Sequence, residues 1–395
     1  MADYLIVGNG VAGTTAAENI RKLDPKGDIT MVTDEDFPFY YRIRLNEYIS
    51  GDLTEQGLLA RKKGWFEEHE IDLRPMTRIA GADPLEKIVI TEDNQRHSYG
   101  SLLLATGSHS FIPPIKGNET RGVFSLRNIQ DARVISVWAN EVENVALIGG
   151  GLLGLEAGNA LRKLGKKVTV VEFFPRLLPR QLDPEGAGML QRIMENMGFS
   201  FRLGAKTQKI EGKGRVGGVL LEGGETLAAG MVVISAGVRP NMELAEPLGL
   251  DKDKGIRVDE RMQTSQPFIY AAGDVAEFKG MPYGIWPAAM EQGKIAGANM
   301  AGGDMIYHGT TMANTLKVVG VDLGSAGNID ADNEFESKTV RGEDIYKKIV
   351  LSDNKVIGCI MLGDTGGFNK ITRAMSQDQD LSQTRDLLVS EGFDL

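Results

Sequence analysis

The chain has 395 residues, of which 42% are hydrophobic and 25% are charged, and its formal net charge is -10. This length exceeds what one compact core usually accommodates, so two or three domains are expected. The negative charge argues against nucleic acid or an anionic membrane as the main partner. No apolar run reaches the roughly 18 to 20 residues that span a bilayer, and the start of the chain is unlike a signal peptide because Asp3 interrupts it.

The cysteine and histidine content excludes further mechanisms. The single cysteine, Cys359, rules out an intrachain disulfide, a dithiol relay and a four-cysteine metal site, and it is typical of a cytoplasmic protein. Because Cys359 stands in the apolar run "KVIGCIMLGD", we expect a buried structural thiol. The four histidines show no zinc-ligand spacing, so no metal site is predicted.

The first predicted unit is a strand from Tyr4, the turn Gly8-x-Gly10-x-x-Gly13 and a helix through Leu23. The first glycine permits the tight turn, the second lets the backbone approach a pyrophosphate, and the third allows close packing of helix on strand. Unpaired N–H groups at the helix N-terminus then face the phosphates. A second strand, "DITMVTDED", ends in Asp34 and Glu35, where a carboxylate can bind ribose hydroxyls.

The second unit repeats this pattern, with the strand "NVALIG", the glycines Gly149, Gly151 and Gly154, and a helix that continues to Leu164. The strand "KKVTVVE" then brings Glu172 to a position 23 residues after Gly149, near the usual spacing of about 20. A carboxylate there accepts hydrogen bonds from the adenosine 2′-hydroxyl and repels a 2′-phosphate, which favours NADH over NADPH. The following loop contains Arg176 and Arg180, which either accommodate such a phosphate or form a solvated surface.

Three further segments are each predicted to be a strand that runs into a turn of small residues. They are "YGSLLLATGS", "GMVVISAGV" and "SQPFIYAAGDVAEF", the last with Asp274 after Gly273. A helix is predicted to begin at Pro287 and to continue to about Met300, since proline is favoured in the first turn. Its N-terminal dipole would stabilise negative charge on a ligand bound there. Trp286, just before it, either covers such a ligand or packs in the core.

Two dinucleotide sites in one chain have an economical chemical explanation, in which one dinucleotide stays bound as a flavin and the other visits as a hydride donor. The motifs "IVGNGVAG", "LLLATGS", "ALIGGGLLGLE", "VVISAGVRPN" and "IYAAGDVAE", spread over roughly 1–300, resemble those of pyridine nucleotide–flavin oxidoreductases of the glutathione-reductase class. The segments "PFYYRIRLNEYISG" and "WPAAMEQGKIAGANMAG" and the C-terminal tail are most similar to NADH:rubredoxin oxidoreductases and to the flavin module of NAD(P)H nitrite reductases.

The resemblance implies an α/β fold with two Rossmann-like domains and a small α+β C-terminal domain. An FAD-binding domain would comprise 1–112 and 240–303, an NAD(P)H-binding domain 113–239, and the C-terminal domain 304–395. In that last domain, "TTMANTLKVVG", "KTVRGEDIYKKIVLSD" and "KVIGCIMLGD" are predicted to form strands and "LSQTRDLLVSEGF" a helix. The domain would form a dimer interface, giving a homodimer, or brace the flavin.

The resemblance also implies cofactor-binding residues, although no catalytic residue is assigned. Those implied for FAD are Gly8, Gly10, Val11, Ala12, Gly13, Asp34, Glu35, Arg42, Ile79, Ala105, Thr106, Gly107, Arg127, Gly273, Asp274 and Trp286. Those implied for NADH, or NADPH, are Gly149, Gly151, Leu152, Leu153, Gly154, Glu156, Glu172, Ala236 and Gly237, with Glu156 near the nicotinamide.

The chain departs from many relatives in the stretch from Tyr40 to Ile49, which contains no cysteine. Disulfide reduction and cysteine-sulfenate peroxidase chemistry are therefore not expected, and electrons would leave the flavin directly. The acceptor implied is a small redox protein, rubredoxin or ferredoxin. A basic face made by Arg61, Lys62 and Lys63 with Arg42 and Arg44 could receive it, or these residues form a solvated surface.

Three alternatives remain open at this stage. They are an NADH oxidase that forms hydrogen peroxide, a redox-sensing flavoprotein, and the flavin subunit of a nitrite-reductase-like system. The chain lacks the cysteines for a sirohaem or iron–sulfur module of its own. A complete nitrite reductase in this chain is therefore not expected.

Overall fold

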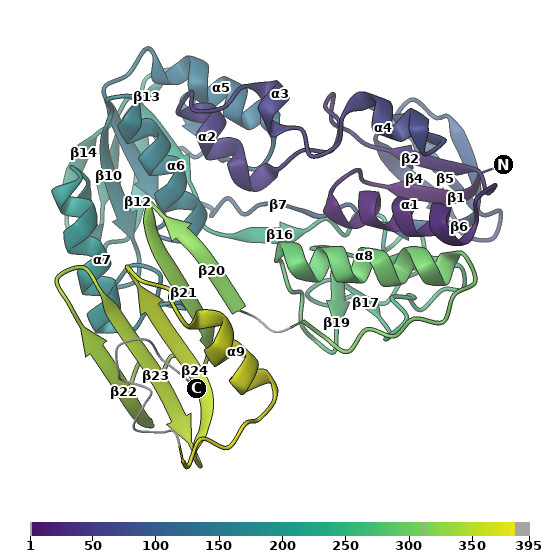
Figure 1. Cartoon of the computed structure of the whole chain (residues 1–395). Helices are drawn as coiled ribbons and strands as arrows, with labels where there is room; N and C mark the ends of the chain where they lie inside the picture. Colours follow the sequence, from purple (N-terminus) through teal and green to yellow (C-terminus); the bar gives the residue numbers. More distant parts are fainter. Residues whose placement is uncertain (1, 311–312, 384–395) are drawn as a thin grey trace. The chain divides into compact units, whose positions relative to one another are not determined.

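The computed structural model describes residues 2–310 and 313–383. Residue contacts divide the chain into two compact units (Figure 1). The first comprises Met1–Arg44, Thr54–His109 and Val238–Thr310, and the second comprises Leu45–Leu53, Ser110–Gly237 and Thr311–Leu395. The predicted helix over 381–393 falls almost wholly outside the described residues. Within 2–310 and 313–383, no helix is both long and apolar enough to cross a membrane.

A large sheet with the strand order β3-β2-β1-β6-β5-β4, joined by β18 beside β6, forms the core of the first unit. Its elements are β1 (Ala2–Val7), α1 (Val11–Leu23), β2 (Ile29–Val32), a 3-10 turn (Arg42–Arg44), α3 (Glu55–Leu58), α4 (Lys63–Glu68), β3 (Ile71–Arg74), β4 (Ile79–Asp83), β5 (Ile88–Thr91) and β6 (Arg96–Leu104), then β16 (Val238–Pro240), β17 (Ile256–Val258), β18 (Ile269–Ala271), β19 (Ala276–Phe278) and α8 (Trp286–Met300). β7 (Ser108–Ser110) lies where the chain passes into the second unit.

The central strands of this sheet are parallel and apolar on both faces. β3, β2, β1, β6 and β18 pair in parallel, and the inner residues Leu5, Ile6, Leu103 and Leu104 are completely buried. Such continuous apolar runs are typical of parallel strands that are covered on both sides. Burying each of these side chains contributes roughly 1.5–3 kcal/mol.

Helices α1 and α8 lie side by side in this unit (Figure 1), and two glycines allow their close contact. A β-carbon placed at Gly293 would lie 2.3 Å from the carbonyl oxygen of Ala12, and one at Gly297 would lie 2.3 Å from that of Ala16. A glycine inside a helix costs roughly 0.5–1 kcal/mol relative to alanine. Its presence at both positions is therefore explained by the helix contact.

The second unit contains a parallel sheet with the order β11-β10-β9-β15-β8, which matches the β3-β2-β1-β6 order of the first unit. Its elements are α2 (Leu45–Ile49), β8 (Val123–Phe124), α5 (Ile129–Ala139), β9 (Asn144–Ile148), α6 (Leu152–Lys163), β10 (Lys167–Glu172), α7 (Pro184–Asn196), β11 (Ser200–Leu203), β12 (Thr207–Gly212), β13 (Val216–Leu221), β14 (Thr226–Ala228) and β15 (Met231–Ile234). The separate antiparallel β12-β13-β14 sheet comes between β11 and β15 in the chain, as β4 and β5 come between β3 and β6 in the first unit.

The C-terminal part of the second unit is an antiparallel sheet with the order β20-β21-β24-β23-β22 and a helix packed against β24 (Figure 1). Its elements are β20 (Ala313–Val318), β21 (Val321–Gly327), β22 (Glu336–Arg341), β23 (Tyr346–Ser352), β24 (Lys355–Leu362) and α9 (Phe368–Ser376). The segment 338–353, predicted to be extended, contains parts of two strands joined by a turn after Arg341. The helix α9 was not predicted.

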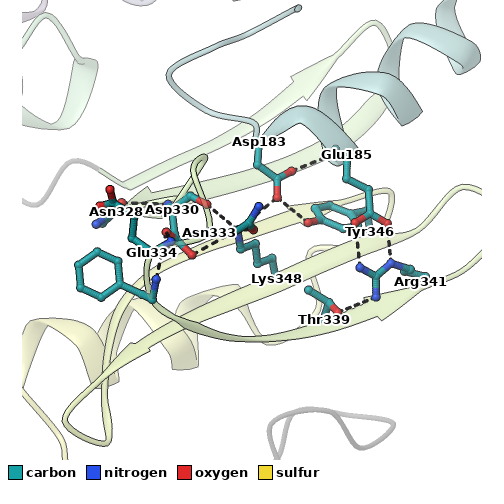
Figure 2. A network of polar contacts seen from close by, with 12 residues as sticks. Asp183, Glu185, Asn328, Asp330, Asn333, Glu334, Thr339, Arg341, Tyr346 and Lys348 are labelled. Carbon is teal, nitrogen blue, oxygen red and sulfur yellow. Dashed lines mark hydrogen bonds and ion pairs between the residues drawn. The ribbon is translucent and has the colours of Figure 1, made fainter.

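A buried polar network connects β23 with the start of α7 (Figure 2). The Lys348 ammonium group, 1% exposed, donates to the carbonyl oxygen of Asp330 at 2.7 Å and lies 3.4 Å from the Asp183 carboxylate. Asp183 also accepts from the Tyr346 hydroxyl at 2.6 Å and from Gly186 N–H at 2.9 Å, so it caps α7 at the same time. Burial and the hydrogen bond to Asp183 raise the pKa of Tyr346.

Candidate functional site

The first glycine turn connects β1 to α1, and the space around its three glycines differs. A β-carbon placed at Gly8, whose φ is +112°, would lie 2.1 Å from the carbonyl oxygen of Ala105. A β-carbon at Gly13 would lie 2.0 Å from the carbonyl oxygen of Gly8, whereas one at Gly10 would meet nothing within 4 Å. The outer glycines therefore close the turn, and the middle glycine leaves backbone open to a ligand.

The second glycine turn, between β9 and α6, shows the same pattern. A β-carbon at Gly149, with φ +113°, would lie 2.2 Å from the carbonyl oxygen of Ser235, and one at Gly154 would lie 2.6 Å from that of Gly149. A β-carbon at Gly151 would meet nothing within 4 Å. Both turns thus have the shape that a pyrophosphate needs, with an accessible backbone ahead of a helix N-terminus.

Backbone hydrogen bonds establish which strand-end residues are equivalent in the two units. The first glycine of each turn donates its N–H to the neighbouring strand, to Val32 at 2.8 Å in one unit and to Val171 at 2.9 Å in the other. The next residues, Thr33 and Glu172, are therefore equivalent. β2 ends at Val32, so the predicted acid Asp34 lies one position beyond the equivalent of Glu172.

The two acids predicted for the first site have different surroundings. Glu35 accepts a hydrogen bond from the Tyr40 hydroxyl at 2.7 Å and forms an ion pair with Arg42. Asp34 is exposed. Glu35 is thus engaged within the protein while Asp34 is open to solvent, and contact of either acid with a ribose stays a prediction. Arg42, also predicted for FAD, is held by Glu35.

The Glu172 carboxylate holds the second glycine turn. One of its oxygens accepts from Gly150 N–H at 2.5 Å and the other from Phe174 N–H at 2.8 Å, and the residue is only 7% exposed. Arg176 is half-buried and donates to a loop carbonyl at 3.4 Å, and Arg180 is exposed. Contact of Glu172 with a ribose, and of either arginine with a 2′-phosphate, stays a prediction.

The predicted turn of Ala105, Thr106 and Gly107 is held by Asn241, a residue that the sequence reasoning did not single out. Asn241 donates its side-chain amide to the Thr106 carbonyl at 2.7 Å and its backbone N–H to the Gly107 carbonyl at 3.0 Å. The Thr106 hydroxyl donates back to the Asn241 carbonyl at 2.9 Å. The motif "VVISAGVRPN" contains Asn241 but gives no sign of this contact, which joins residues 135 positions apart.

The third predicted turn lies against the first glycine helix. A β-carbon at Gly273, with φ +82°, would lie 3.1 Å from the Ala12 β-carbon, so this turn packs on the start of α1 beside Val11 and Ala12. The Gly273 N–H donates to the buried side chain of Gln292 on α8 at 2.9 Å. Asp274 accepts from the Ser108 hydroxyl at 2.7 Å. The first glycine turn, the Asp274 turn and α8 thus meet in one place.

Trp286 at the start of α8 is half-buried and stacks with two aromatic rings. Its ring centroid lies 5.7 Å from that of Phe39 and 5.7 Å from that of Tyr41, with interplanar angles of 21° and 26°. Both alternatives for Trp286, covering a flavin or packing in the core, stay predictions. Ile79, also predicted for FAD, opens β4 and is 8% exposed.

The remaining predicted residues lie in the second unit. Leu152 and Leu153 begin α6, and Leu153 is 48% exposed. Ala236 and Gly237 follow β15 and are exposed. The Arg127 N–H donates to the Asp131 carboxylate at 2.8 Å, where α5 begins. Its contact with a flavin stays a prediction.

Glu156 connects α6 to the C-terminal sheet. Its carboxylate accepts from the Val319 N–H, between β20 and β21, at 2.7 Å. Burial raises the pKa of the Glu156 carboxyl, although this hydrogen bond acts in the opposite direction. The resemblance implied a place near the nicotinamide, which stays a prediction.

Two of the arginines considered for a basic face are partly neutralised within the protein. Arg61 lies 3.4 Å from the Glu18 carboxylate and over the Trp65 ring, and Arg42 pairs with Glu35.

Cys359 is completely buried, and burial raises its pKa to about 12. The prediction of a buried structural thiol is thus confirmed.

Two equivalent strand–turn–helix units, each with an open central glycine, define this chain as a protein with two dinucleotide-binding turns. Residues 2–293 match the pyridine nucleotide-disulphide oxidoreductase family, and residues 313–379 match the rubredoxin NAD+ reductase C-terminal domain. The chain therefore belongs to the pyridine nucleotide-disulphide oxidoreductase family, a family of enzymes that use FAD and NADH.

Individual relatives agree with this assignment. The chain is 36% identical over 389 residues to the NAD(P)H nitrite reductase of Bacillus subtilis, which covers 98% of this chain and 48% of the relative. It is 30% identical over 385 residues to the NADH-rubredoxin oxidoreductase of Clostridium acetobutylicum, with 97% of both covered. The chain spans about half the length of the nitrite and nitrate reductase relatives that it matches.

Solved structures show the same fold. The crystal structure of NADH:rubredoxin oxidoreductase from Clostridium acetobutylicum superposes with a TM-score of 0.85 at 29% identity, over 97% of each chain. The predicted family, the α/β fold class with FAD- and NAD-binding domains and the oxidoreductase assignment are therefore confirmed.

Proposed function

We propose that this protein takes a hydride from NADH onto a bound FAD and passes the electrons to a small electron-transfer protein such as rubredoxin, without a protein disulfide. The observation that carries the proposal is the pair of equivalent glycine turns, each open at its middle glycine, in a chain whose one cysteine is completely buried. When bound, FAD supplies the change from two-electron to one-electron chemistry.

In this proposal the first glycine turn holds the FAD. Gly10 and the N-terminus of α1 would receive the pyrophosphate, Asp34 the ribose, and the turns at Thr106 and Asp274 would enclose the cofactor from the carboxyl ends of β6 and β18. NADH would bind at Gly151 and α6. The FAD domain would comprise 1–112 and 240–303, the NAD(P)H domain 113–239, and the C-terminal domain 304–395.

The choice of acceptor is supported by relatives. The Clostridium acetobutylicum relative is named an NADH-rubredoxin oxidoreductase and matches this chain over nearly its whole length. The C-terminal residues 313–379 match a domain named for rubredoxin NAD+ reductase. A small acidic redox protein would have to approach through local basic groups, because this chain is itself acidic.

A second candidate function is supported by the Bacillus subtilis relative. It is a nitrite reductase, and it matches 98% of this chain with about half of its own length. In this case the protein would be the flavin subunit of a nitrite-reductase-like system, and another protein would receive its electrons.

Stopped-flow reoxidation of the NADH-reduced protein tests both candidates. The reduced protein is mixed with rubredoxin, ferredoxin or oxygen, or with nitrite plus a sirohaem protein. The proposal expects rubredoxin to reoxidise it fastest. Faster reoxidation by oxygen would identify an NADH oxidase, and slow reoxidation by every acceptor would favour a redox sensor. If the purified protein does not become yellow when FAD is added, it does not bind FAD, and both candidate functions are contradicted.

A further inference from the structure

Two adjacent phenylalanines are exposed beside the second glycine turn. Phe173 is 65% exposed and Phe174 is 51% exposed, and they directly follow Glu172 at the carboxyl end of β10. A single exposed apolar side chain is ordinary in a folded protein. An exposed aromatic pair at the carboxyl end of a parallel strand is different, because ligands of open α/β sheets bind at this edge.

The backbone beneath these rings is fixed by hydrogen bonds. Phe174 N–H donates to the Glu172 carboxylate at 2.8 Å, and the Phe174 carbonyl accepts from Gly204 N–H at 2.9 Å. The Glu172 carbonyl accepts from Ala205 N–H at 3.0 Å. The two ring centroids are 5.6 Å apart and the rings are nearly perpendicular, at 82°. The pair is therefore presented to solvent from an anchored backbone.

The first unit has different chemistry at the equivalent positions. Because Thr33 is equivalent to Glu172, Phe173 and Phe174 are equivalent to Asp34 and Glu35. The first site thus has two carboxylates where the second site has two aromatic rings. In the second site the single carboxylate is instead bound to the glycine turn through Gly150 N–H.

From these contacts we infer that Phe173 and Phe174 bind the adenine ring of the pyridine dinucleotide and supply much of the affinity of the second site for it. The inference rests on the proposed function and names the part of that site that recognises adenine. A dinucleotide held by its pyrophosphate at Gly151 places its adenosine at the end of the second strand, which here is β10. Adenine presents a flat π-face that stacks on aromatic side chains.

Isothermal titration calorimetry with ADP-ribose and the FAD-loaded full chain measures the affinity of the second site and tests the inference without turnover. Because the two rings are nearly perpendicular, only one of them can stack face to face on the adenine while the other meets its edge. The double variant Phe173→Ala/Phe174→Ala is therefore expected to weaken binding about tenfold, which is the strength of one base–aromatic stack, and each single variant by part of that loss. Phe173→Trp should retain binding, whereas Phe173→Leu should not. Phe335→Ala, which removes an exposed phenylalanine elsewhere in the same unit, is the control and should bind like the parent.

A second measurement separates this inference from the proposed function. Reduced nicotinamide mononucleotide contains the nicotinamide but no adenine, so the double variant should be reduced by it as fast as the parent while losing its preference for NADH. Equal ADP-ribose affinity in the parent and the double variant would overturn the inference alone. A parent that neither binds ADP-ribose nor accepts electrons from NADH would overturn the proposed function instead.

Discussion

The side-chain amide of Asn241 donates to the Thr106 carbonyl at 2.7 Å, and the Thr106 hydroxyl donates to the Asn241 carbonyl at 2.9 Å. This reciprocal pair closes the turn after β6 at the point where the chain returns to the first unit. Asn241 thus shapes a turn that is predicted to face the FAD, although no sequence motif marked it as a binding residue. It is a positioning residue in the proposed site.

Replacing Asn241 by alanine is expected to weaken FAD binding about tenfold, because an unsatisfied polar group costs about 1–3 kcal/mol. FAD titration of the apoprotein, followed by flavin fluorescence, measures the effect. Asn140→Ala, at an exposed asparagine on the end of α5, is the control. An unchanged FAD affinity in Asn241→Ala with intact secondary structure would show that this turn does not depend on the amide.

Replacing each of the two open glycines is expected to remove the binding of a different dinucleotide. Gly10→Ala has room for its β-carbon and should fold, but it should lose FAD because the methyl group occupies the approach of the pyrophosphate. Gly151→Ala should retain the yellow colour and lose NADH affinity. Absorbance at the flavin band and NADH titration measure the two effects.

Gly13→Ala is the matched contrast, since its β-carbon would lie 2.0 Å from a backbone oxygen. This variant should lower the thermal unfolding temperature, whereas Gly10→Ala should leave it near that of the parent. A Gly10→Ala protein that binds FAD normally would contradict the assigned role of the open glycine.

The buried Lys348 predicts a large stability effect. Lys348→Met leaves the carboxylates of Asp183 and Asp330 without their cation, and breaking such a buried pair costs about 3–5 kcal/mol. Urea denaturation followed by circular dichroism measures the loss. Lys206→Met, which removes an exposed ion pair with Glu222, should cost no more than about 1 kcal/mol. Equal losses in the two variants would show that the network is not stabilising.

The buried thiol predicts a dependence on pH. Burial raises the pKa of Cys359 from 9.0 to about 12, so the folded protein retains a proton that the unfolded chain has lost above pH 9. The stabilising contribution of the protonated Cys359 thiol is fully present below pH 9 and is lost as the pH rises toward 12. Cys359→Ala should therefore show a shallower alkaline loss of stability than the parent. Thiol reagent at pH 8 should label the parent only after unfolding.

Local sequence predicted both strand–turn–helix elements, because the glycine spacing and the apolar strands depend on near neighbours. The offset of Asp34 relative to Glu172 could not be predicted, since it depends on which strand residue accepts from Gly8 N–H. The hydrogen bond from Tyr40 to Glu35 and the ion pair of Arg42 with Glu35 depend on the conformation of the loop between these residues. The contacts of Asn241 and Gln292 join distant segments, and no pattern of nearby residues encodes them.

The glycine contact between α8 and α1 has a consequence for mutational tolerance. Gly293 and Gly297 face carbonyl oxygens of α1 at distances that admit no side chain, whereas their neighbours Met290 and Glu291 are exposed. In a saturation library these two codons should remain glycine while the neighbouring codons vary freely. Redesign of the proposed FAD site would accordingly have to change the loops at the strand ends and leave the contact between α1 and α8 unaltered.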